Sequence, residues 1–204
     1  MRLARLAAPL ALLVLAACAS KDGLNDPPPE LGDFRMGHNV VVGETARQVP
    51  PTRSATAEEW EAVLTEEIGK RLGRHQGAGL YHIGVSVDAY ALAIPGVPVV
   101  LKPRSVLVLS VTVWDNATRS KINVEPGQLT VFENLGLTGE SIVGSGITQS
   151  REQQMQNLAT AASRTIERWL TEHKDWFSSD PALREAARAE AAVVQPRQGP
   201  TPGN

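Results

Sequence analysis

The segment 105-SVLVLSVTVW-114 decides the fold, because apolar side chains occupy both faces of the strand that it predicts. One face carries four large aliphatic side chains, namely Leu107, Leu109, Val111 and Val113. The other face carries Val106, Val108 and Trp114. A strand that is apolar on both faces belongs in the middle of a sheet. The sequence therefore predicts a central strand here.

Residues 81–90 predict a second long strand with one buried face and one more polar face. Apolar side chains alternate there with small or polar ones, which is typical of a half-buried strand. This alternation assigns His82, Asp88 and Tyr90 to the polar face. Trp114 of the first strand lies on the same face of the sheet if the two helices described below both cover the opposite face. Shorter strands are predicted at residues 39–42, 119–124, 129–133 and 141–148, from apolar runs bounded by turn residues.

Two amphipathic helices flank these strands. Thr56 and Glu59 have the spacing of a capping box, and apolar residues at helical intervals follow as far as residue 72. Ser150 and Gln153 repeat that pattern before an apolar stripe that includes Ile166 and extends to residue 170 or 177. Asp180 and Pro181 predict the start of a third, alanine-rich helix that ends near residue 194. Arg188 on this helix is expected to tolerate substitution, as surface positions usually do.

These elements predict an α+β domain. We expect a mainly antiparallel sheet of four to five strands, two amphipathic helices on one of its faces and a short C-terminal alanine-rich helix. The single domain is expected at residues 34–178, with the peripheral helix at 179–194. Residues 18–33 contain three consecutive prolines and predict a flexible tether, and the Pro/Gly-rich residues 195–204 predict a disordered tail.

The first residues predict export and acylation. Arg2 and Arg5 precede an apolar run that ends in Leu15-Ala16-Ala17-Cys18, which is the pattern of an export signal. The last four residues resemble the bacterial lipobox. That resemblance implies removal of residues 1–17 and attachment of a diacylglycerol, usually with a further fatty acid such as palmitate, to Cys18. The alternative is an ordinary secretory signal with an incidental cysteine.

The lipobox resemblance also implies a location. Ala19 follows the cysteine, whereas the inner-membrane retention signal of lipobox proteins is typically aspartate. The expected location is therefore the outer membrane, with the domain facing the periplasm, because two or three acyl chains anchor a protein stably. The order of elements is similar to that of the lipopolysaccharide-export lipoprotein and of the auxiliary lipoproteins of lipid-transport ABC systems. Those resemblances imply no functional residue besides Cys18.

Composition excludes several classes of function. The chain of 204 residues has 20 basic and 22 acidic side chains, so no basic excess indicates nucleic-acid binding. Its single cysteine excludes an internal disulfide, and its four scattered histidines predict no metal site. We expect no cofactor and no catalytic residue. The alternative is a lipid-anchored periplasmic hydrolase whose carboxylates, Asp88, Asp115 and Glu133, meet only in the folded protein.

A partner-binding surface is expected beside the two long strands. Residues 94–103 carry five aliphatic side chains among three prolines, an unusual composition for a loop. Ile94, Val97, Val99 and Trp114 are the candidate partner-binding residues, while the alternatives place this loop over the core or make its end an early start of the next strand. The sequence thus favours a non-enzymatic lipoprotein that binds an envelope protein or lipid in outer-membrane assembly, transport or maintenance.

Overall fold

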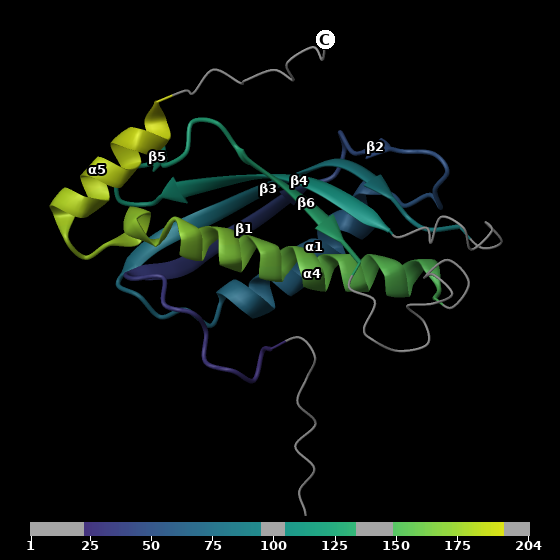
Figure 1. Cartoon of the computed structure of the whole chain (residues 1–204), viewed down its shortest axis with the longest axis horizontal. Coiled ribbons are helices and arrows are strands. Elements are labelled where there is room, and N and C mark those ends of the chain that lie inside the picture. Colours follow the sequence, from purple (N-terminus) through teal and green to yellow (C-terminus); the bar gives the residue numbers. More distant parts are fainter. Residues whose placement is uncertain (1–22, 95–104, 134–148, 194–204) are drawn as a thin grey trace, which may run out of the picture.

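Two long helices cover one face of a twisted sheet (Figure 1). The computed structural model describes residues 23–94, 105–133 and 149–193. Six strands form the sheet in the order β1-β3-β4-β5, with β2 beside β3 and β6 beside β4. The strands are β1 (Phe34–Val42), β2 (Arg47–Gln48), β3 (Gly79–Ala91), β4 (Val106–Asp115), β5 (Ser120–Lys121) and β6 (Gly127–Phe132). The α+β class predicted from the sequence is confirmed.

The sheet is mainly antiparallel, as predicted, but it is mixed rather than purely antiparallel. β3 pairs antiparallel with β4, and β4 pairs antiparallel with β5 and β6. β1 and β2, however, pair parallel with β3. The reason is the connection: helix α1 (Ala57–Leu72) lies between β1 and β3, and a strand that returns through a helical crossover runs parallel to the first.

The central strand predicted at 105–114 is β4, and its core-facing side chains are completely buried. Leu107, Leu109, Val111 and Val113 are all inaccessible to solvent. They pack beneath helices α1 and α4 (Arg151–Glu172) in one hydrophobic cluster that also contains Leu64 and Ile166. The core therefore lies between β3 and β4 on one side and the two helices on the other.

A β-bulge in β3 overturns the assignment of Tyr90 to the open face. The register shifts between Val87 and Ala89, so that Tyr90 pairs with the core-facing Leu107. The Tyr90 ring is buried, and its centroid lies 5.3 Å from the centroid of the Trp60 ring. The Tyr90 hydroxyl donates to Ala55 O at 2.9 Å. Simple alternation fails here because the extra residue of a bulge reverses the side-chain direction beyond it.

The predicted strand 119–124 is reduced to the two residues of β5. Beyond β5, the Asn123 side chain hydrogen-bonds to the backbone of β4. Its Oδ1 accepts from Val113 N at 2.8 Å, and its Nδ2 donates to Val111 O at 2.9 Å. A side-chain amide thus satisfies backbone groups of β4 that a longer strand would have paired. The strand expected at 141–148 lies outside the described residues.

Both predicted capping boxes are present. Thr56 caps α1 with Glu59, and Ser150 caps α4 with Gln153. α4 ends at Glu172, and a 3₁₀ helix, η2 (Lys174–Phe177), follows it. Helix α5 (Pro181–Ala192) is capped by Asp180 as predicted and has no buried residue. Within the described ranges, no helix combines the length and the apolar composition needed to span a membrane.

Part of the segment expected to be a tether packs on the domain. Leu31 is only 2% exposed and belongs to the hydrophobic core. The Asp33 amide donates to Phe177 O at 2.9 Å, which joins this segment to η2. The ordered domain therefore begins before residue 34.

Candidate functional site

A row of aromatic and basic side chains crosses one end of the open sheet face. The register pairs His82 with Trp114, and Trp114 with Lys121. The His38 ring stacks on His82 with centroids 4.9 Å apart, and Lys121 Nζ lies 5.6 Å from the centre of a Trp114 ring. Trp114 remains 40% exposed. We call these four residues the aromatic row, and the predicted candidate Trp114 lies at its centre.

The aromatic row is positioned by local backbone geometry. His82 Nδ1 accepts from His38 N at 2.9 Å, and His82 Nε2 lies 3.2 Å from Asn116 Oδ1. Gly37 makes room for the ring, because a Cβ atom there would lie 2.7 Å from His82 Cε1. The imidazole is thus fixed on both sides.

The rest of the described open face is polar at its centre. Ser86 pairs with Ser110, whose hydroxyl donates to Asp88 at 2.6 Å. Exposed aliphatic and aromatic side chains lie toward the edges, namely Val40 and Val42 on β1 and Phe132 on β6. The half-buried Val106 and Val108 of β4 also lie on this face, and Val106 pairs with Phe132.

Beside the aromatic row, a groove of about 460 Å³ lies between α5 and the turn that joins β4 to β5. Lys121 belongs to both features. The apolar lining of this α5 groove comes from Ile122, Pro181, Ala189 and Ala192. Its polar lining comes from Thr118, Ser120, Lys121, Arg184, Glu185 and Arg188.

The contacts of Arg188 contradict the expectation that this position tolerates substitution. Its Nη1 atom lies 2.5 Å from Oδ2 of the buried Asp115, and its Nη2 donates to the Tyr81 hydroxyl at 3.1 Å. Nε donates to Trp176 O at 3.0 Å. Burial raises the pKa of Tyr81, although the nearby charge of Arg188 opposes that rise. Arg188 therefore fixes α5 to the end of β4.

The other two cations of the α5 groove lack such a partner. Among the described residues, no carboxylate forms an ion pair with Lys121 or Arg184, and the Arg184 side chain donates to Ser178 O at 2.8 Å. Glu185 is the one acidic residue in the lining, and it is exposed. A groove lined by apolar side chains and by two cations without acidic partners suits a ligand that carries an anionic group next to apolar atoms.

A hollow of about 350 Å³ between α1 and α4 is electrostatically different. Its residues include Glu59, Glu66 and Arg151. Arg151 pairs with Glu59, and Glu66 pairs with Lys70. The hydrogen bond from Arg151 lowers the pKa of Glu59. Because these charges already satisfy one another, the α5 groove is the stronger candidate for binding.

The three carboxylates of the hydrolase alternative do not converge. Asp88 lies on the open face beside Ser110, whereas Asp115 ends β4 on the core side. Glu133 follows β6 at the opposite end of β4, where its amide donates to Ser105 O and its carboxylate accepts from Asn157. Asp115 also accepts from Ala117 N, as expected of a turn residue. No group of three potential metal ligands occurs in the described ranges.

One of the other predicted candidates, Ile94, lies within the described residues. Cys18, Val97 and Val99 lie outside the described residues, and Ile94 is half-buried beyond the end of β3. Lys121 and Arg184 were missed because nothing in the local sequence sets them apart from other exposed cations. Of the residues predicted from the sequence, Trp114 pointed to this end of the sheet.

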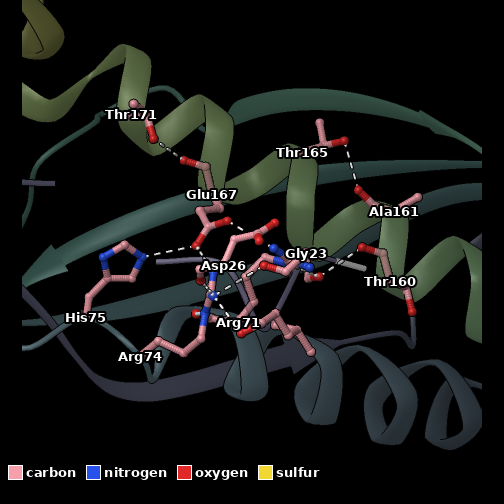
Figure 2. A network of polar contacts seen from close by, with 12 residues as sticks. Gly23, Asp26, Arg71, Arg74, His75, Thr160, Ala161, Thr165, Glu167 and Thr171 are labelled. Atoms are coloured by element: carbon pink, nitrogen blue, oxygen red, sulfur yellow. Dashed lines mark hydrogen bonds and ion pairs between the residues drawn. The ribbon is translucent and has the colours of Figure 1, made fainter. Parts of the chain in front are cut away.

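A buried ionic cluster joins α1 to α4 on the helix side (Figure 2). Arg71 Nη1 and Arg74 Nη2 bind opposite oxygens of Glu167 at 3.1 and 3.0 Å, and His75 Nε2 lies 3.1 Å from Oε1. Arg71 also donates to Ser163 Oγ at 2.9 Å. Burial raises the pKa of Glu167, but hydrogen bonds from His75 and Arg71 and the charge of Arg71 outweigh it, so this pKa lies below its ordinary value.

Comparisons with known proteins give structural neighbours only. No protein-family model matches the chain, and no characterised protein matches it significantly. A candidate lipoprotein from Caulobacter crescentus is 17% identical, covers 63% of this chain and 89% of its own, and has a TM-score of 0.34. A DUF330-family protein from Xanthomonas campestris is 10% identical, with coverages of 72% and 93% and a TM-score of 0.38.

A third neighbour is the PelC dodecamer from Paraburkholderia phytofirmans. It is 12% identical, covers 71% of this chain and 91% of its own, and has a TM-score of 0.34. Similarity at this level does not place the chain in the lipopolysaccharide-export or ABC-transport families. The functional argument below therefore rests on the residues of this chain.

Proposed function

We propose that this protein is a non-enzymatic lipoprotein, anchored through Cys18 in the outer membrane, whose domain binds an anionic envelope partner. The observation that carries this proposal is the aromatic row with the α5 groove beside it. There Trp114 is exposed and Lys121 and Arg184 have no acidic partner among the described residues.

The proposed role is in assembly, transport or maintenance of the envelope. The partner is a protein or lipid that presents a carboxylate or phosphate next to apolar atoms. An aromatic side chain beside a cation provides both apolar contact area and charge, a combination common at binding hot spots. The three carboxylates of the hydrolase alternative lie apart, so no observation favours that second function.

The anchor is tested first. Mass spectrometry of the mature N-terminal peptide is expected to show a diacylglyceryl group on Cys18, and Cys18→Ser is expected to release the protein from the membrane fraction. Mature protein that retains residues upstream of Cys18 would refute the anchor.

The binding surface is tested by charge reversal in the α5 groove. We expect the Lys121→Glu, Arg184→Glu double variant to lose proteins or lipids that the wild-type lipoprotein retains during capture from solubilised envelopes. The matched control, Arg47→Glu with Arg168→Glu, changes the net charge equally at exposed positions outside the groove. Identical retention by both double variants would exclude the groove as the binding surface.

A further inference from the structure

The Arg74 guanidinium holds the N-terminal segment against the helix layer. Arg74 Nη1 donates to Asp26 O at 2.9 Å and to Leu24 O at 3.1 Å, and lies 3.5 Å from Gly23 O. On its other side, Arg74 Nη2 binds Glu167 at 3.0 Å. Figure 2 shows Gly23 and Asp26 beside this cluster. We call this arrangement the Arg74 clamp.

Two further contacts keep the segment in place. Asp26 N donates to Gly23 O at 3.3 Å, which closes a turn in which Gly23 has a φ of +66°, a conformation that favours glycine. Leu31 is inserted in the hydrophobic core. The segment from Gly23 to Leu31 is therefore attached at both ends to the same side of the domain.

The Arg74 clamp shortens the connection to Cys18. Only residues 19–22 separate Cys18 from Gly23. A fully extended chain of that length spans no more than about 18 Å, whereas a free tether from Cys18 to the start of β1 could span about 55 Å. The first distance is shorter than the width of a small domain, so it restricts how the domain can turn against the membrane.

We propose that the Arg74 clamp orients the domain, with the helix layer next to the lipid headgroups and the open sheet face turned away from them. This inference rests on the proposed acylation of Cys18. The clamp contacts α1 and α4 through Arg74 and Glu167, and these helices cover the face of the sheet opposite the aromatic row. Figure 1 shows the first described residues at the lower side of the molecule and α5 at the upper left.

The orientation identifies two surfaces with different partners. The loop after α1 and the adjoining part of the helix layer face the anchoring lipid surface. The aromatic row is out of reach of that leaflet, so its partner approaches from the periplasmic side. A lipid headgroup of the anchoring leaflet is thereby excluded as the occupant of the row.

Energy transfer in vesicles tests this orientation. The acylated full-length protein is reconstituted in phosphatidylethanolamine–phosphatidylglycerol vesicles that carry a headgroup acceptor dye. A donor is attached to a new cysteine at Gln76, two residues from Arg74, or at Thr130 on the open face. Both positions are exposed, and acylation of Cys18 leaves the new cysteine as the sole free thiol. We expect stronger transfer from position 76 than from position 130.

Two variants separate the clamp from other causes. Arg74→Gln is expected to abolish the difference between the two positions, whereas Arg168→Gln, an exposed arginine on α4, is expected to preserve it. A ten-residue Gly/Ser insertion after residue 22 leaves the clamp intact but lengthens the connection between Cys18 and Gly23. It is expected to lower transfer from both positions and to remove their difference, even if Arg74→Gln fails to fold.

The outcomes distinguish this inference from the function on which it rests. Vesicle-bound wild-type protein with equal transfer from both positions would overturn the orientation and leave the acylation standing. Protein that fails to bind vesicles would overturn both. A difference that survives Arg74→Gln and the insertion would show that something other than the clamp orients the domain.

Discussion

The buried ionic cluster and the α5 groove each contain more than one cation. They differ in whether those cations have a carboxylate partner. In the cluster, Arg71, Arg74 and His75 converge on Glu167, which is 6% exposed. In the groove, Arg188 is neutralised by Asp115, while Lys121 and Arg184 are not paired with any described carboxylate. The cluster is therefore closed to further ligands, and the groove is open to them.

The difference shows how structural and functional charges can be separated in a protein of this kind. Removing one member of a buried, mutually satisfied set leaves its partners charged in a poor solvent, which is costly. Removing a cation that has no carboxylate partner leaves no buried charge unpaired and costs little. Stability should therefore depend on the cluster, and binding on the groove.

The largest effect is expected for Glu167→Ala. It leaves the buried Arg71 without its carboxylate and should lower the free energy of unfolding by about 3–5 kcal/mol, measured by urea titration. Glu172→Ala, an exposed position on the same helix, is the control and should change it by no more than about 0.5 kcal/mol. Similar values for the two variants would mean that the cluster is not structural.

Arg188→Asp is expected to have the next largest effect. It places a second carboxylate beside the buried Asp115 and should cost about 2–4 kcal/mol in the same titration. Arg184→Asp, on the same helix, should cost about 0.5 kcal/mol or less, because Arg184 has no acidic partner among the described residues. The comparison between neutralised and free cations fails if both α5 variants behave alike.

The pH dependence sharpens the contrast further. The pKa of Glu167 is lowered in the folded state, so its stabilising contribution is present above the unfolded value of about 4.3 and is lost as the pH falls through the folded pKa. The difference in unfolding free energy between the wild type and Glu167→Gln should therefore shrink below about pH 4. Chemical denaturation at several pH values from neutral downward measures it. A constant difference over that range would contradict the lowered pKa.

The smallest effect on stability is expected for Lys121→Ser combined with Arg184→Ser. Loss of two unpaired cations should change the unfolding free energy by no more than about 0.5 kcal/mol. Partner capture from envelopes should nevertheless fall. A marked loss of stability would instead show that these side chains belong to the structural set.

Local signals in the sequence were sufficient for much of the fold. The capping boxes at Thr56 and Ser150 fixed both helix starts, because a cap needs only residues three apart. The double-sided apolar pattern of residues 105–114 placed β4 correctly. Tyr90 was mispredicted and the parallel pairing of β1 was not predicted, since a bulge and a crossover depend on how strands meet rather than on their composition.

The candidate site was less predictable. Trp114 could be selected as an aromatic residue at the end of an exposed face. Whether a cation is free depends on where the carboxylates fall after folding, as the pairing of Arg188 with Asp115 across 73 positions shows. The Arg74 clamp was equally hidden, because the proline-rich composition of residues 18–33 suggested only a tether.

The Asn123 side chain has a consequence for behaviour at high concentration. It occupies the gap between β5 and β6, where it bonds to the amide of Val113 and the carbonyl of Val111. An uncovered stretch of strand edge at this point would be a template on which another chain could add a strand, the usual first step in aggregation of β-proteins. By closing this gap, one amide side chain protects the most apolar strand of the sheet from edge-to-edge association.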